Sequence, residues 1–172
     1  MVLTAMMMAL VCVATMVIAI PTPMTGGFVN LGDCFVLLSA WALGPVYGMA
    51  AGGIGSALAD ILLSYTHYAP GTLAIKGLMA LVAALVFQAA RHTIKKDYPA
   101  RLLSAIPAEL IMIAGYFGYA WLILGKSAAA ALTSVPDNAF QAVVGTAAAI
   151  ALCGVVDVTR LAGKKARKAG NH

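Results

Sequence analysis

The sequence predicts an all-α integral membrane protein, a single six-helix domain over residues 1–172 with both termini in the cytoplasm. The first observation is composition: 62% of the residues are hydrophobic and only 10% are charged, whereas a soluble domain has about 25% charged residues. The second is that the apolar residues gather in six runs, most of them near the roughly 20 residues that a helix needs to cross a bilayer. The connecting segments are too short for a sizeable soluble domain.

The first three predicted helices cover residues 2–20, 32–43 and 46–63. Pro21 closes the first run, and no basic residue precedes that run, so we interpret it as a retained helix rather than a signal peptide. Pro45 separates the second run from the third, because proline disfavours helix at the residue before it. The third run is rich in glycine, alanine and serine, and such small residues let helices approach closely in lipid.

The last three predicted helices cover residues 71–90, 102–124 and 138–158. A basic connection, residues 91–101, joins the fourth helix to the fifth. Pro136 and Asp137 form a helix-start signal before the sixth. A basic tail, residues 160–172, is expected to follow the last helix as a frayed segment.

Basic residues predict the orientation of the bundle. Nine of the eleven Lys and Arg residues lie in the connection 91–101 or the tail 160–172. An even number of helices separates each cluster from the N-terminus, so all three lie on one side, which the positive-inside rule assigns to the cytoplasm. The loops 21–31, 64–70 and 125–137 then face outside. Topology and contact with anionic lipid account for the basic residues, and we expect no nucleic-acid binding.

Most of the remaining polar side chains are predicted to lie near the outer face. A charged side chain inside a bilayer costs about 2.5–3.5 kcal/mol, so it usually faces a cavity or a partner. Asp60 and Lys76 have similar depth on consecutive helices, which predicts a structural ion pair that a ligand could share. His67, between Tyr65 and Tyr68, belongs either to an interfacial aromatic cluster or to a lid over a flat ligand.

Glu109 lies deeper, in the cytoplasmic half of the fifth predicted helix. Its spacing places it on one helix face with Met112, Tyr116 and Tyr119. We interpret it as a buried, hydrogen-bonded carboxyl group and leave its role open. The three cysteines, Cys12, Cys34 and Cys153, show no paired spacing and are expected to be small buried hydrophobes.

Several catalytic signatures are absent from the sequence. It contains no Walker-type loop, no His-Glu-x-x-His, no Gly-x-Ser-x-Gly and no Cys-x-x-Cys motif. We therefore expect neither an enzyme nor a cofactor or metal site.

Five segments carry a resemblance to a known family. They are residues 27–33 (GFVNLGD), 42–46 (ALGPV), 52–60 (GGIGSALAD), 68–70 (YAP) and 76–79 (KGLM). The chain resembles the substrate-binding S components of energy-coupling-factor (ECF) vitamin transporters, in the riboflavin-like or hydroxymethylpyrimidine-like branch. Specific motifs of the family cover about residues 1–90, and the rest of the chain agrees with the family mainly in length and hydropathy.

The resemblance implies a function in a prokaryotic plasma membrane. The S component would bind a vitamin tightly near the outer face, dock on a transmembrane coupling subunit with two ATPase subunits, and topple to release the vitamin inside. Small residues on the first helix would form the docking surface, and Ala5 and Ala9 match its Ala-x-x-x-Ala spacing. The resemblance places the pocket at Asn30, Asp33, Tyr65, His67, Tyr68, Lys76, Tyr116, Asn138 and Gln141.

Aromatic rings, neutral hydrogen-bonding groups and one cation would suit a small heteroaromatic vitamin. A vitamin B6 form or hydroxymethylpyrimidine is favoured, and pantothenate, riboflavin and cobalamin remain open. A stand-alone secondary transporter or channel is the main alternative, and it would need a polar path to the cytoplasmic side. A membrane structural or assembly protein is a further alternative.

Overall fold

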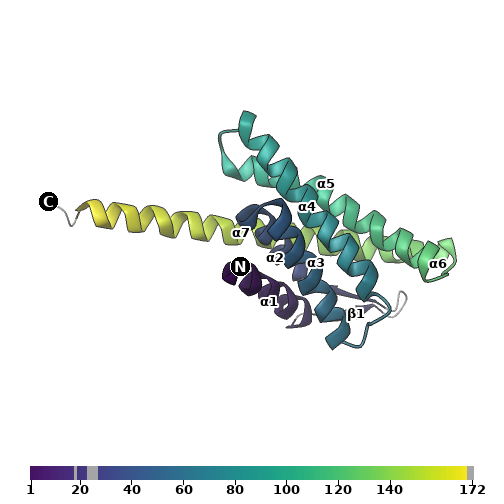
Figure 1. The fold of residues 1–172 in the computed structure, drawn as a ribbon. Coiled ribbons are helices and arrows are strands. Elements are labelled where there is room, and N and C mark those ends of the chain that lie inside the picture. Colours follow the sequence, from purple (N-terminus) through teal and green to yellow (C-terminus); the bar gives the residue numbers. More distant parts are fainter. Residues whose placement is uncertain (18, 23–26, 170–172) are drawn as a thin grey trace.

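The computed structural model describes the backbone of residues 1–17, 19–22 and 27–169, and side chains at 1–17, 19 and 30–155. Six main helices form one bundle, which confirms the predicted fold class (Figure 1). The elements in chain order are α1 (Val2–Val17), β1 (Ala19–Thr22), β2 (Gly27–Asn30), α2 (Gly32–Leu43), α3 (Pro45–Leu62), α4 (Ala69–Thr93), α5 (Asp97–Gly118), a π-helical turn η1 (Tyr119–Ile123), α6 (Ala128–Leu132) and α7 (Ser134–Ala169).

Three helical segments among the described residues are long and apolar enough to cross a membrane. They are Ala69–Thr93, Asp97–Ile123 and Ala128–Val155. The apolar helices α1 and α2 are shorter, with 16 and 12 residues. Many large apolar side chains face outward, among them Ile106, Leu110 and Val143, each more than half exposed. An outward apolar surface of this kind suits lipid rather than water.

Helix α3 packs against α1, α2 and α4, and its glycines allow close contact. A Cβ atom added to Gly53 would lie 2.8 Å from the Leu73 carbonyl oxygen of α4. A Cβ atom on Gly55 would lie 2.6 Å from the Met8 carbonyl oxygen of α1. Real Cβ atoms do not approach backbone atoms so closely, so the predicted role of small residues in helix packing is confirmed.

The first predicted loop contains a β-hairpin, which the sequence reading missed. Strands β1 and β2 pair antiparallel, with Ala19 opposite Asn30. Helix α1 consequently ends at Val17 rather than at residue 20. Pro21 explains part of this difference, because proline disfavours helical conformation at the residue before it and lacks the N–H that would continue the helix.

Several other helix boundaries differ from the prediction. The tail was expected to fray after residue 158, but α7 continues to Ala169, in a segment rich in the strong helix formers Ala, Leu, Lys and Arg. Figure 1 shows this end of α7 projecting beyond the bundle. Helix α5 begins at Asp97 rather than 102, and α6 interrupts the loop predicted at 125–137. Ser127 caps α6 by accepting a hydrogen bond from the Ala130 N–H, at 3.2 Å.

The turn predicted between α2 and α3 is present. Gly44 has φ of 79°, a conformation that favours glycine, and Pro45 opens α3. At the same end of the bundle lies the connection between α4 and α5, where Asp97 is paired with Arg91 and, at 3.8 Å, with Arg101. The opposite end carries the hairpin, the α3–α4 connection, η1 and the start of α7. The polar side chains of the candidate site are at this second end.

Candidate functional site

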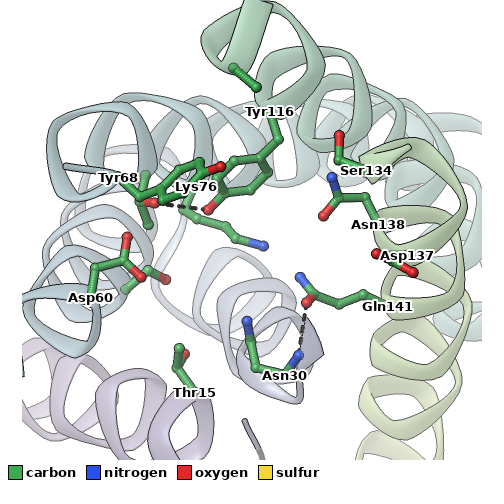
Figure 2. Close-up of a pocket in the computed structure, with 13 residues that line it drawn as sticks. Thr15, Asn30, Asp60, Tyr68, Lys76, Tyr116, Ser134, Asp137, Asn138 and Gln141 are labelled. Carbon is green, nitrogen blue, oxygen red and sulfur yellow. Dashed lines mark hydrogen bonds between the residues drawn. The ribbon is translucent and has the colours of Figure 1, made fainter. Parts of the chain in front are cut away.

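A pocket lies at the hairpin end of the bundle and draws on nearly every main element. It contains about 650 Å³ of empty space, including the part open to solvent. Figure 2 shows side chains from α1, α3, α4, α5 and α7 converging on it. The lining residues are Thr15, Asn30, Ser56, Asp60, Tyr68, Thr72, Lys76, Tyr116, Ala120, Ser134, Asp137, Asn138 and Gln141.

A buried ion pair lies at the inner limit of the pocket. The Lys76 ammonium group donates to Asp33 Oδ1, and the two side chains are 3% and 0% exposed. The second carboxylate oxygen, Asp33 Oδ2, accepts a hydrogen bond from Gln141 Nε2 at 2.8 Å. Both oxygens of Asp33 are therefore satisfied, as a buried charge requires.

The predicted pair of Asp60 with Lys76 is wrong, because Lys76 pairs with Asp33. Asp33 lies in the first turn of α2, and α7 passes close beside it. A Cβ atom on Gly145 would lie only 2.8 Å from the Asp33 Cβ atom. This close approach of α7 encloses Asp33 between helices. Because a buried carboxylate requires a compensating charge, Asp33 pairs with Lys76. Asp60 lies on the pocket wall instead.

Gln141 links the ion pair to the hairpin. Its Oε1 accepts a hydrogen bond from the backbone N–H of Asn30 at 2.8 Å, while its Nε2 donates to Asp33. The Asn30 side chain in turn accepts from the Gly32 N–H at 2.8 Å. One side chain of α7 thereby holds the end of β2 and the start of α2 in a defined position at the pocket.

Tyrosine side chains form one wall of the pocket. The Tyr116 hydroxyl donates to Thr72 Oγ1 at 3.0 Å, and the Lys76 ammonium lies 5.5 Å from the centre of the Tyr116 ring. Tyr119 packs on α4 at Gly71, where a Cβ atom would lie 2.6 Å from the ring, and donates to the His67 carbonyl oxygen at 2.9 Å. These contacts hold α5 and η1 against α4.

Asp60 and Ser56 stand one turn apart on α3 and line the opposite wall. They are 4% and 1% exposed. Neither Asp60 Oδ2 nor Ser56 Oγ has a hydrogen-bond partner among the described residues. Because buried polar atoms are nearly always hydrogen-bonded, unpartnered atoms beside a pocket indicate a place for a ligand.

Comparison with known proteins gives the family. The sequence model of the family described as "ECF-type riboflavin transporter, S component" matches residues 1–157. The chain belongs to this family. It is therefore the substrate-binding subunit of an ECF transporter and a multi-pass membrane protein. S components are binding subunits rather than enzymes, and they associate with a coupling component and ATPases.

Two individual proteins are similar to this S component. "Uncharacterized protein in gap 3'region" of Pyrococcus woesei is 35% identical over 121 residues, which is 70% of this chain and 78% of that protein. A solved structure, "Structure and mechanism of the S component of a bacterial ECF transporter", superimposes with a TM-score of 0.69 over 94% of both chains. At 18% identity, this second likeness supports the fold alone.

The structure brings together six of the nine residues predicted for the pocket of the S component: Asn30, Tyr68, Lys76, Tyr116, Asn138 and Gln141. Asp33 lies just behind the lining and acts on it through Lys76 and Gln141. Tyr65 and His67 do not line the pocket. His67 is exposed and packs on Tyr68, with ring centres 4.7 Å apart, and Tyr65 lies next to it at 6.4 Å.

The sequence reading did not select Thr15, Ser56, Thr72, Ala120, Ser134 or Asp137, which also line the pocket. For one pair a signal was available: the four-residue spacing of Ser56 and Asp60 places both on one helix face. Thr15 gave no such signal, since a threonine in an apolar helix commonly bonds its own backbone. Thr15 does so here, donating to the Val11 carbonyl oxygen at 2.8 Å.

Glu109 of the S component is buried beneath the pocket and faces α7. Its Oε1 accepts a hydrogen bond from the Thr146 hydroxyl of α7 at 3.3 Å, which agrees with the predicted buried, hydrogen-bonded carboxyl group. Its Oε2 has no partner among the described residues. Of the residues predicted to share its helix face, Met112 is fully buried and Tyr116 lines the pocket. Tyr119 begins η1 and packs on Gly71 of α4.

Proposed function

We propose that this S component captures a small heteroaromatic vitamin in the pocket, with a vitamin B6 form or hydroxymethylpyrimidine as the favoured substrate. The observation that carries the proposal is the pocket described above, which combines two tyrosine rings with a set of hydrogen-bonding groups. A flat ring fits against Tyr68 and Tyr116, while polar substituents fit the groups on α3 and α7. Riboflavin, named in the family description, pantothenate and cobalamin are the alternative substrates.

The proposed orientation places the pocket at the outer face of a prokaryotic plasma membrane. The pocket is at the end of the bundle opposite the connection between α4 and α5. Four of the eleven Lys and Arg residues, at 91, 95, 96 and 101, lie in that connection or in the adjoining helix turns. The positive-inside rule assigns the basic end to the cytoplasm, so the pocket opens outward.

The proposed partners are a transmembrane coupling subunit and two ATPase subunits. Helix α1 presents Ala5 and Ala9 on its exposed side, while its other side packs on α3 through Val11. Small exposed side chains four residues apart allow a second helix to approach closely in lipid. We assign docking to this surface and substrate release to toppling of the S component on the coupling module.

Binding measurements on the purified protein test the proposal. Isothermal titration with a panel of B vitamins should find one tight binder at one molecule per chain, with a dissociation constant below about 1 µM. The panel should contain pyridoxine, pyridoxamine, hydroxymethylpyrimidine, riboflavin, pantothenate, thiamine and cobalamin. Absence of a tight binder from the whole panel would contradict vitamin capture.

Transport measurements separate this proposal from a stand-alone transporter. Vesicles that contain the S component alone should bind the vitamin without accumulating it. Vesicles that also contain the coupling subunit, the ATPases and ATP should accumulate it. Accumulation by the protein alone would instead favour a secondary transporter, with Glu109 and Thr146 as the first residues to examine below the pocket.

A further inference from the structure

The charges around the pocket are unevenly distributed. Two of the thirteen lining residues, Asp60 and Asp137, carry carboxyl groups, and one, Lys76, carries an ammonium group. That ammonium is already paired with a third carboxylate, Asp33, which does not itself line the pocket. Carboxyl groups therefore outnumber ammonium groups among the lining residues, and Lys126 adds one positive charge at the Tyr68 side, where it donates to the Tyr68 hydroxyl at 3.1 Å. A negatively charged ligand group that lay near Asp60 would be repelled.

Asp60 is a buried carboxyl group that lines the pocket. Its side chain points into the pocket from α3, and its Oδ2 atom has no partner among the described residues (Figure 2). One turn away, the Ser56 hydroxyl is also buried and unpartnered within the described part of the chain. The Asp60 carboxylate has a side-chain hydrogen bond with Thr72, but its Oδ2 atom still lacks a donor. A ligand that brings an N–H or a cation would supply one.

The opposite side of the pocket offers a second polar group of residues. Figure 2 shows Ser134, Asp137 and Asn138 of α7 across the cavity from Asp60, with the Tyr116 and Tyr68 rings at the wall that joins the two sides. A ring lying against the tyrosines would thus present one edge to α3 and the other to α7. Polar groups on the two edges of the ligand would therefore contact two different helices.

We infer that the substrate is an amino-substituted or cationic nitrogen heterocycle that donates an N–H hydrogen bond to Asp60, with Ser56 beside it. This inference rests on the proposed function and specifies the substrate class of the same pocket. Lys76 does not reverse the preference, because a carboxylate ligand that approached it would also approach Asp33. Ligands that carry a carboxylate on the same ring bind more weakly than those that carry an amine.

Matched ligands and variants test this inference. Pyridoxamine, pyridoxine and 4-pyridoxate share one ring and differ in a cationic, neutral or anionic substituent; 4-amino- and 4-oxo-hydroxymethylpyrimidine form a second pair. The variants are Asp60→Asn, Ser56→Ala and, as a control, Asp97→Asn, which removes a carboxylate at the opposite end of the bundle. Affinities are measured by isothermal titration, and thermal unfolding of each variant verifies that it is folded.

In the unaltered protein pyridoxamine should bind at least about tenfold more tightly than 4-pyridoxate, and the 4-amino pyrimidine should bind more tightly than its 4-oxo counterpart. Asp60→Asn should lower this ratio about tenfold to a hundredfold, and Ser56→Ala should weaken amine binding about threefold to tenfold. Asp97→Asn should change neither the affinity ratio nor the affinity for the amine. Because the readout is a ratio between two ligands on one variant, a general loss of folded protein cannot produce it.

The outcomes distinguish this inference from the proposed function. If the carboxylate binds as tightly as the amine, or if Asp60→Asn leaves the ratio unchanged, the inference is wrong while vitamin capture stands. If only a vitamin outside both series binds, without an amino or cationic nitrogen group, the inference is again overturned. If no vitamin binds, the proposed function fails and this inference fails with it.

Discussion

Lys76 of α4 and Asp33 of α2, 43 positions apart in the sequence, form a buried ion pair directly behind the pocket. A third helix takes part, because Gln141 of α7 donates a hydrogen bond to the second carboxylate oxygen of Asp33. One hydrogen-bonded group thus joins α2, α4 and α7 at the level where the ligand would lie. The stability of the bundle and the shape of its pocket consequently depend on the same side chains.

Removal of one partner of the ion pair should be costly. We expect Lys76→Met to lower the free energy of unfolding by about 3–5 kcal/mol, because it leaves Asp33 buried without a compensating charge. Combining it with Asp33→Asn should restore much of that loss. Denaturant unfolding in detergent, followed by circular dichroism, provides the measurement. Equal stability of the single and double variants would show that Asp33 does not depend on Lys76.

Gln141 should hold Asn30 and Asp33 in place at the pocket, and an apolar side chain should not be able to replace it. Gln141→Leu removes the donor to Asp33 and the acceptor for Asn30, which should weaken vitamin binding by about 1–3 kcal/mol. Titration of the purified variant measures this loss. Val143→Ala is the matched control, because Val143 lies on the same helix and is 70% exposed. A comparable loss of binding in the control would argue against a specific role for Gln141.

Two glycine substitutions should have opposite effects on stability. Gly53→Ala places a Cβ atom 2.8 Å from the Leu73 carbonyl oxygen and should destabilise the protein by about 1–3 kcal/mol. Gly118→Ala meets nothing within 4 Å and should be neutral or stabilising by up to about 1 kcal/mol, since alanine is the better helix former. The two melting temperatures are compared in the same detergent. Similar shifts for both would contradict close packing of α3 on α4.

Substitutions on α1 should separate docking from binding. Ala9→Trp enlarges an exposed side chain that does not line the pocket, so vitamin affinity should stay within about twofold. ATP-driven uptake with the coupling module should fall at least about tenfold, because the bulky ring prevents close helix approach. Leu152→Trp, at an exposed position of α7, is the control and should leave uptake unchanged. Normal uptake by Ala9→Trp would place the docking surface elsewhere.

Much of the candidate site was predictable because helix periodicity and proline positions determine how deep each residue lies. Tyr68, Tyr116 and Asn138 were assigned to the outer end of their helices, and all three line the pocket. Depth does not determine which way a side chain faces. Asp60 was the carboxylate expected at the depth of Lys76, and only the packing of α2, α3 and α4 decided that Asp33 is its partner.

The sequence by itself determined that the chain is a bundle of apolar helices with its basic residues at one end and its polar pocket residues at the other. Composition, the spacing of the apolar runs and the alternating direction of successive helices are sufficient for this prediction, because each can be determined from the order of residues along the chain. Only the tertiary structure decided the hairpin pairing of β1 with β2 and the bond from Gln141 to Asp33. Each depends on contacts between segments that meet only when the helices pack, and glycines such as Gly145 set how closely they meet.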